Sequence, residues 1–505
     1  MTKNWILSAV LSLMALAPLF SQEPEMPINP EHSLEVGASV SAGKIPMKPA
    51  MIFDDLRTVF FFSDGPFTVK TDLSFINDGK YPTHLNYELG HNFIPNDCFI
   101  AIHGGAFALD GGRSLIKDEV QGPYSLFLSA KETPLTNIGF VFDNDRIRYE
   151  TRWISLNYRS ANVYEGTSLP WLDRGMNYKA YSLSLGAFRF GYQDASVYVG
   201  QVFDFESFIN PLPAFIQQMV LTTGGRPFSQ VTNPNSLMGF FGTWTGETAS
   251  AYAQFLVDDI NGAFLAPLLS WAIPALNDIN NVEKLAWSIG GSWESPVGKL
   301  SFHHGGATKY AFESTYAEGN TPGGFGLAAP DYDSLPYPYV YYPATSYGYQ
   351  GEIYTVYPGE NYIGYQHGEN NLSFLIGWEG SPGKDLPWGF ESEAELEYSI
   401  TGSQSPANPW HELDTWTSIG KAFVMFDEPT LEHSLRLAAM ARKTIKAWTF
   451  SAGFILGWKW NPLKPCEVPG RPDEAMIWKP TLGESLPVYG ITLGASYKFD
   501  WNAKR

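Results

Sequence analysis

Charged side chains recur at every second position in two separate stretches of the sequence, and the residues between them are mostly apolar. Residues two apart lie on the same face of a β-strand, so each stretch predicts a strand with one charged face and one apolar face. Glu150 shares the charged face of the first stretch. The two charged rows are Arg146, Arg148 and Arg152 in the first stretch, and Glu391, Glu393, Glu395 and Glu397 in the second.

The chemistry open to these rows depends on what surrounds them. A charge that faces hydrocarbon at the middle of a membrane costs about 2–4 kcal/mol, so in a transmembrane barrel both rows should point into the lumen. There they would form a constriction that selects solutes, or a bed for a polar ligand. Alternatively, they would form an ion-pair network that holds the barrel in shape. Lys421, Arg436 and Arg442 are candidates to join either arrangement.

A second group of candidate residues lies in a connection rich in tyrosine, proline and glycine, at residues 316–349. Tyrosine combines a flat apolar face with a polar hydroxyl group. Sugars expose C–H faces ringed by hydroxyl groups, so tyrosines close to Asp331 and Asp333 are suited to bind a glycan. The alternative is a long external loop that packs on its own rings. The candidate glycan-binding residues are Tyr332, Tyr337, Tyr339, Tyr341, Tyr342 and Tyr347.

The sequence contains no catalytic or metal-binding motif that we recognise. His303 and His304 are adjacent on a predicted strand and therefore face opposite sides. Neither a Gly-x-Ser-x-Gly elbow nor a His-Glu-x-x-His helix occurs. We therefore predict a protein that is not an enzyme and that uses no cofactor or metal. The two cysteines, Cys98 and Cys466, lie far apart in the sequence; they could pair after export, but two lone cysteines in so long a chain are more often unpaired.

The strands that would carry these residues alternate apolar and polar side chains along most of the chain. The last one, residues 489–501, places its aromatic and aliphatic side chains on one face and Gly, Thr, Ser, Lys and Asp on the other. A sheet in lipid must satisfy all its backbone hydrogen bonds, so it closes on itself. We expect the first strand, Ser33–Gly43, to pair with the last one. The spacing predicts an all-β transmembrane antiparallel barrel of about 16–18 strands.

Composition agrees with a membrane barrel rather than with a soluble β-sandwich, which is the alternative for an alternating pattern. Only 17% of the 505 residues are charged, 15% are aromatic and 48 are glycine. The formal net charge of −19 argues against nucleic acid as a partner. Outer-membrane lipids and either a surface polysaccharide or a small solute are the expected partners. The sequence does not specify the oligomeric state.

Three further features complete the predicted organisation. Residues 1–21 resemble a secretory signal peptide, residues 22–32 form a short periplasmic tail, and residues 33–505 form the barrel, which places the mature protein in the outer membrane of a double-membraned bacterium. Two segments, 208–236 and 260–280, are irregular, and one or the other is expected to fill the lumen at least in part. Tyr124–Ala130 and Tyr362–His367 are predicted as strands, and a shift of apolar parity after Trp153 predicts a bulge.

The middle of the chain resembles the Wzi-type capsule-assembly proteins, which are outer-membrane barrels that hold polysaccharide at the cell surface. Three runs carry the resemblance: Phe208–Leu212, Asn235–Gly239 and Tyr252–Asp259. The sequence departs from that family in having at most one candidate helix, near residues 262–279, and in having Val356 where a histidine is expected after Tyr354–Thr355. The resemblance implies a non-enzymatic barrel that binds or anchors surface polysaccharide; the alternative is an outer-membrane porin or transporter for small solutes.

Overall fold

The computed structural model describes most of the chain, in thirteen segments. The predicted signal peptide and most of the tyrosine-rich connection lie outside them. The described residues are 31–44, 51–77, 91–128, 134–158, 173–221, 235–259, 283–312, 346–349, 352–355, 362–380, 389–404, 424–468 and 471–500.

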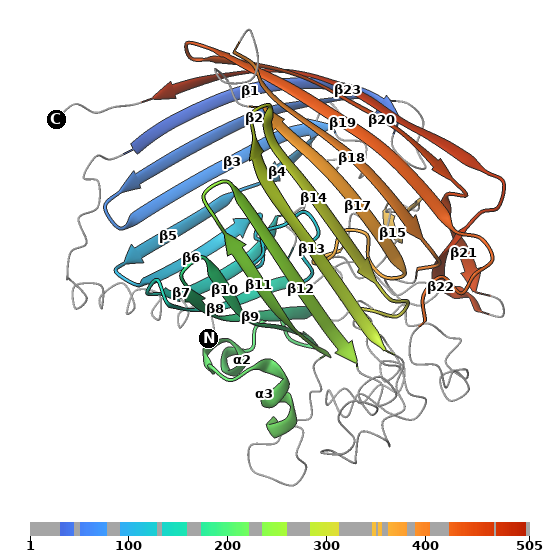
Figure 1. Cartoon of the computed structure of the whole chain (residues 1–505), viewed down its shortest axis with the longest axis horizontal. Helices are drawn as coiled ribbons and strands as arrows, with labels where there is room; N and C mark the ends of the chain where they lie inside the picture. The colour runs from blue at the N-terminus through green and yellow to red at the C-terminus, as the bar shows by residue number, and fades with distance from the viewer. Residues whose placement is uncertain are drawn as a thin grey trace.

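The described strands build one closed antiparallel barrel (Figure 1). The first strand, β1 (Glu31–Lys44), pairs with the last, β23 (Ser485–Asp500), from Ser33↔Asp500 to Lys44↔Tyr489. This confirms the predicted closing pair. Nineteen strands make the ring. Because β4 (Asn92–Pro95) and β5 (Cys98–Gly104) pair one after the other with β3 (Phe67–Asn77), the ring has eighteen positions, which agrees with the prediction.

Each remaining barrel strand pairs with its neighbours in the chain. The alternation of apolar and polar residues does not reveal β2, and β11 begins inside the segment 208–236 that is predicted to be irregular. Two further hairpins, β15–β16 and β21–β22, are separate from the barrel sheet. The bounds are β2 (Met51–Asp64), β6 (Phe107–Ser114), β7 (Leu135–Asp143), β8 (Ile147–Asn157), β9 (Arg174–Leu185), β10 (Phe188–Val199), β11 (Asn235–Thr245), β12 (Ala249–Asp259), β13 (Lys284–Ser295), β14 (Gly298–Ala307), β15 (Ser346–Tyr349), β16 (Glu352–Thr355), β17 (Asn371–Gly380), β18 (Glu391–Thr401), β19 (Glu432–Ile445), β20 (Trp448–Trp460), β21 (Leu463–Val468) and β22 (Arg471–Pro480).

The outer face of the barrel is apolar, as expected for contact with lipid. Along β20, exposed side chains alternate with less exposed ones over the whole strand. Trp448 lies at one end of this outward row and Trp458 and Trp460 at the other, all between 41% and 48% exposed. The Trp448 ring also packs edge-on against Tyr497 of β23, with centroids 5.1 Å apart. Aromatic side chains at both ends of an apolar band are typical of a barrel that meets two lipid headgroup layers.

The lengths of the connections orient the barrel in the membrane. Seven of the connections between consecutive barrel strands that pair with each other contain only two or three residues, and all seven lie at the end of the barrel where β1 begins and β23 ends. Gly105 and Gly186 occur in two-residue turns at this end with φ of 57° and 60°, a backbone region that favours glycine. Outer-membrane barrels have short periplasmic turns and long extracellular loops. We therefore place the short turns in the periplasm.

Two short helices follow β10 at the extracellular end, α2 (Phe205–Ile209) and α3 (Ala214–Leu221). They do not enter the lumen. Instead they pack on the outside of the wall, α2 against β8 and α3 against β10 and β11 (Figure 1). The prediction that residues 208–236 fill the lumen is therefore wrong for its described part, and residues 260–280 lie outside the described residues. No helix in the described part of the chain is long and apolar enough to span a membrane.

Two predicted strands are instead irregular segments that fold into the barrel. Residues 115–128, between β6 and β7, form turns, and Tyr124, Leu126, Phe127 and Leu128 are all 0% exposed. Residues 362–370, before β17, also form turns, with Ile363 and Tyr365 buried. An apolar strand pattern and an apolar segment that fills a lumen look alike in sequence, because both are short apolar runs.

Candidate functional site in the barrel lumen

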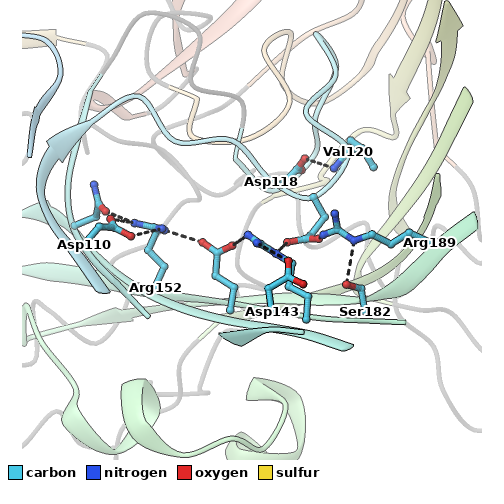
Figure 2. Close-up of polar contacts among 11 residues, drawn as sticks. Asp110, Asp118, Val120, Asp143, Arg152, Ser182 and Arg189 are labelled. Atoms are coloured by element: carbon cyan, nitrogen blue, oxygen red, sulfur yellow. Dashed lines mark hydrogen bonds and ion pairs between the residues drawn. The ribbon is translucent and has the colours of Figure 1, made fainter. Parts of the chain in front are cut away.

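Residues 115–128, which we call the lumenal segment, leave the extracellular end of β6 and fold back into the barrel (Figure 2). Glu119 forms ion pairs with Arg148 of β8, at 3.0 Å between Nε and Oε1, and with Arg189 of β10. Both arginines lie close to the periplasmic ends of their strands. The segment therefore reaches deep into the lumen on this side.

A second anchor joins the lumenal segment to β12. The Asp118 Oδ2 atom accepts hydrogen bonds from Gln254 Nε2 at 2.8 Å and from the Phe127 N–H at 3.0 Å. Gln254 Oε1 in turn accepts the Leu126 N–H at 2.9 Å. Burial raises the pKa of the Asp118 carboxyl group, while these hydrogen bonds act in the opposite direction. One amide side chain thus fixes two points of the lumenal segment.

The third anchor lies on the other side of the lumen. The Tyr124 hydroxyl donates a hydrogen bond to Glu397 Oε1 of β18 at 2.9 Å. His367 Nε2 lies 2.8 Å from the same oxygen, and Arg436 of β19 lies 3.8 Å from Glu397 Oε2. The rings of Tyr124, Tyr365 and His367 pack edge-on, with centroids 5.7–5.8 Å apart. The lumenal segment therefore spans the barrel from β8 and β10 to β18.

A cluster of buried apolar side chains lies inside the barrel around these anchors. Leu126, Phe127 and Leu128 belong to one buried cluster with inward side chains of the neighbouring wall, including Ile154 and Leu156 of β8. Ile154 and Leu156 therefore share the inward face of Arg148 and Arg152. The predicted bulge of β8 is present but displaced, since the register shift against β9 lies between Ser155 and Asn157, two residues beyond the change of apolar parity after Trp153.

The arginine row makes a dense network with its own acidic neighbours. Arg152, whose side chain is 9% exposed, donates through both terminal nitrogens to Asp110, at 2.6 and 3.0 Å, and through Nε to Glu150 at 2.9 Å (Figure 2). Arg148 donates to Glu150 at 2.8 Å as well as to Glu119. Arg146 is not part of this row, because it lies exposed in the turn between β7 and β8.

The glutamate row on β18 pairs with β19 rather than with the arginine row. Glu393 accepts a hydrogen bond from Arg442 at 3.0 Å, and Arg436 lies 3.8 Å from Glu395. Glu391 lies opposite Arg442 in the strand register and is exposed. The side chains of Glu393 and Glu395 are 45% and 50% exposed. The two rows are thus separate, and the lumenal segment connects them through Glu119 and Tyr124.

The remaining predicted site residues contribute no described side chain to the lumen. Tyr332, Tyr337, Tyr339, Tyr341, Tyr342 and Lys421 lie outside the described residues, and Tyr347 lies in β15. Cys98 and Cys466 are both free. Within the described ranges, no group of three or more His, Cys, Asp or Glu side chains is arranged to hold a metal ion.

Sequence reasoning missed the residues that anchor the lumenal segment. Glu119, Gln254 and His367 show no periodic pattern, and their partners are distant in the chain. The one available signal was Gln254, which lies within the Tyr252–Asp259 run of the family resemblance. Its position opposite Asp118 and Leu126 gives this run a structural role in seating the lumenal segment.

The hydrogen bond between Tyr124 and Glu397 provides a first test of this docking. Replacing Tyr124 by Phe keeps the buried ring but removes a hydrogen bond to a carboxylate, and we expect the free energy of unfolding to fall by about 1.5 kcal/mol. Urea unfolding of the refolded barrel in lipid vesicles measures the change. Tyr398→Phe is the control. Tyr398 follows Glu397 on β18, and its hydroxyl group is hydrogen-bonded to His433 Nδ1, at 2.8 Å, in an exposed position. A control loss equal to that of Tyr124→Phe would contradict the prediction.

No protein-family model and no curated protein matches the sequence. Among solved structures, the chain is similar to Wzi, described as a carbohydrate-binding barrel involved in group 1 capsule assembly in Escherichia coli, with 12% identity, coverage of 97% of this chain and 87% of that one, and a TM-score of 0.49. It is also similar to OccAB4 of Acinetobacter baumannii, with 8% identity, 95% and 100% coverage and a TM-score of 0.45. OprD of Pseudomonas aeruginosa shows 7% identity, 95% and 96% coverage and a TM-score of 0.44.

At such low identities these likenesses do not assign a ligand to this chain, and membership in the Wzi-type family stays a prediction. The class of the protein rests on its own geometry. The ring of strands is closed, its outer face is apolar with aromatic side chains at both ends, and the short turns gather at one end. The chain is an outer-membrane β-barrel.

Proposed function

We propose that this protein is a non-enzymatic outer-membrane barrel with a filled lumen that binds or anchors polysaccharide at the cell surface. The observation that carries the proposal is the lumenal segment, which spans the barrel from Glu119 at Arg148 and Arg189 to Tyr124 at Glu397. A barrel of this strand number leaves an aqueous channel when its interior is empty. Here buried side chains occupy that space, so the extracellular mouth becomes the surface available for binding.

The sequence of the extracellular connections supports a sugar as the ligand. The connection between β14 and β17 runs from residue 308 to residue 370 and includes the tyrosine-rich stretch. Tyrosines with neighbouring aspartates combine apolar faces with hydrogen-bonding groups, which is the chemistry that a pyranose ring requires. The runs that resemble the Wzi-type proteins also lie at this end of the wall, in the connection after β10 and in β11 and β12.

Single-channel conductance of the refolded protein in a planar lipid bilayer tests the filled lumen. We expect a correctly folded barrel to insert and remain silent, because the lumenal segment blocks the path of ions. Heat-modifiable migration on a gel verifies that the inserted barrel is folded. Stable, ion-selective openings of the unmodified protein would contradict the proposal and would favour the transport of small solutes.

Replacement of Tyr337, Tyr339, Tyr341 and Tyr342 by Ala tests the binding site. Aromatic side chains at the centre of a contact surface commonly contribute about 2 kcal/mol or more each, so the fourfold variant should lose polysaccharide binding almost completely. Retention of labelled surface polysaccharide on proteoliposomes measures the loss. The control replaces Tyr158 and Tyr164, in the connection between β8 and β9, by Ala in the same way. Unchanged binding by a folded fourfold variant would remove these tyrosines from the site.

A further inference from the structure

The outer face of the barrel wall carries polar side chains where an apolar band is expected. On β8 and β9, Arg152 and Ala180 face the lumen, so the alternating neighbours Thr151 and Lys179 face outward. Lys179 of β9 lies opposite Thr151 of β8 on one side and opposite Asp194 of β10 on the other. Lys179 and Asp194 are nonetheless 1% and 0% exposed. Something other than lipid therefore covers them.

These polar residues lie at the height of the membrane. Lys179 is six residues from Leu185, which ends β9 at the periplasmic turn and is 56% exposed. Six residues extend about 20 Å along a strand, which is about 15 Å along the axis of a barrel whose strands tilt by about 40°. The apolar band of such barrels is about 25 Å tall, and a lysine on its lipid face costs about 2–4 kcal/mol at the midplane. An uncovered Lys179 would bear much of that cost.

Residues 202–217, which we call the helical cover, lie over this part of the wall and include α2 and the start of α3 (Figure 2, opposite side of the strands from the lumen). The Lys179 ammonium group donates to the carbonyl oxygens of Asn210 at 2.7 Å and Leu212 at 2.8 Å. Asp194 Oδ2 accepts the N–H of Ala214 at 2.8 Å. The outward polar side chains are thus used to bind the backbone of the helical cover.

Two side chains of the neighbouring strand β8 also bind the beginning of the helical cover. Thr151 donates to the carbonyl oxygen of Phe208 at 2.9 Å, and the Trp153 indole N–H donates to that of Val202 at 2.6 Å. Asp204 caps α2 by accepting the N–H groups of Glu206 and Ser207. The bonds from Thr151, Trp153, Lys179 and Asp194 all lie on the side of the helical cover that faces the barrel. The opposite side is left to face outward.

Large hydrophobic side chains dominate the outward side of the helical cover, which also exposes Glu206 in the first turn of α2. Six of its large hydrophobic side chains are between 40% and 62% exposed. Below them on the same wall, toward the periplasm, Leu183, Leu185, Phe188 and Phe190 of the lipid-facing band are between 38% and 57% exposed. The apolar surface therefore continues from the strands onto the helices. The six exposed residues are Phe203, Phe205, Ile209, Leu212, Phe215 and Ile216.

We propose that the helical cover is a membrane-embedded element that takes the place of the strand surface between β8 and β11 and contacts lipid acyl chains of the outer leaflet. Its continuity with the lipid-facing band identifies the occupant of its outer side. Residues 200–221 contain no lysine or arginine, so the surface lacks the cations that would select phosphate headgroups. It fits hydrocarbon, and it allows this part of the wall to keep polar outward side chains within the membrane.

Site-directed spin labelling of the full chain in phosphatidylcholine vesicles tests this inference. A nitroxide is attached separately at Ile209→Cys and Phe215→Cys in a background with Cys98→Ser and Cys466→Ser. We expect the ratio of oxygen to nickel-chelate collision rates at both sites to approach the ratio at Phe450→Cys on β20. It should exceed severalfold the ratio at Leu482→Cys, which is 78% exposed in the extracellular connection before β23. All labelled side chains are exposed, so the variants should fold.

Two results would overturn the inference. Collision ratios at Ile209 and Phe215 equal to that at Leu482 would place the helical cover in water above the membrane. Low accessibility to both oxygen and the nickel chelate, with dipolar broadening between labels that grows with the protein-to-lipid ratio, would place a second copy of the chain on this surface instead of lipid.

Discussion

A barrel in which residues 116–133 are replaced by a short glycine–serine connection is expected to conduct ions continuously in a planar bilayer, whereas the unmodified protein stays silent. The change removes the side chains that reach from Glu119 at Arg148 to Tyr124 at Glu397. It leaves the closed ring of strands, whose hydrogen-bonded pairs do not include the lumenal segment. An empty eighteen-strand ring is wide enough for an aqueous channel. Single-channel recording measures the effect.

The same replacement of residues 159–172, between β8 and β9, serves as the control for shortening an extracellular connection. This control should stay silent, because the anchors at Arg148, Gln254 and Glu397 remain in place. If the variant lacking the lumenal segment folds but does not conduct, other parts of the chain close the barrel, and the lumenal segment is not the element that blocks it.

Replacing Arg152 by Met is expected to lower the free energy of unfolding by about 3–5 kcal/mol, the usual cost of removing one partner from a buried ion pair. Asp110 and Glu150 would lose the guanidinium group that both contact, and Asn137 would lose a donor to its side-chain oxygen. The methionine side chain keeps much of the volume but none of the charge. Urea unfolding in vesicles, followed by tryptophan fluorescence, measures the loss.

Arg442→Met is the matched control, because Arg442 makes a similar contact in a different environment. Its ion pair with Glu393 is 3.0 Å long, and the two side chains are 43% and 45% exposed. Water screens such pairs, and their contribution is about 1 kcal/mol or less. Equal losses in the two variants would mean that burial adds nothing to the arginine network. A small loss at Arg152 alone would make the network dispensable for stability.

The fold could be predicted from the sequence wherever one face of a strand meets lipid and the other meets water. On β20 and β23 this simple environment gives strict alternation, and the predicted pairing of the first and last strands is confirmed. The rule failed on β8, where Ile154 and Leu156 face inward because the lumenal segment covers them. It also failed on β2, where Phe60, Phe61 and Phe62 are consecutive and conceal the period of two.

The candidate site could be predicted only in its regular part. Arg148, Glu150 and Arg152 are neighbours on one strand face, so their spacing reveals them. The lumenal segment is held instead by contacts between distant parts of the chain. Tyr124 and Glu397 are 273 residues apart, and Asp118 and Gln254 are 136 apart. A single sequence has no local signal for such pairs, because they arise only when the barrel closes around the segment.

The seam between β1 and β23 has a consequence for how this protein assembles. It joins the two ends of the sheet, and the hydrogen bond between Ser41 and Thr492 across it links residues 451 positions apart. Apart from β3 with β5, every other described pair in the ring joins barrel strands that follow one another in the sequence. Contacts between residues so far apart in the sequence form slowly, because the entropy of closing the long intervening loop is lost before the contact stabilises the chain. The unfinished barrel is therefore a long sheet with two unpaired edges, and both edges disappear in one zippering step that waits for the C-terminal strand.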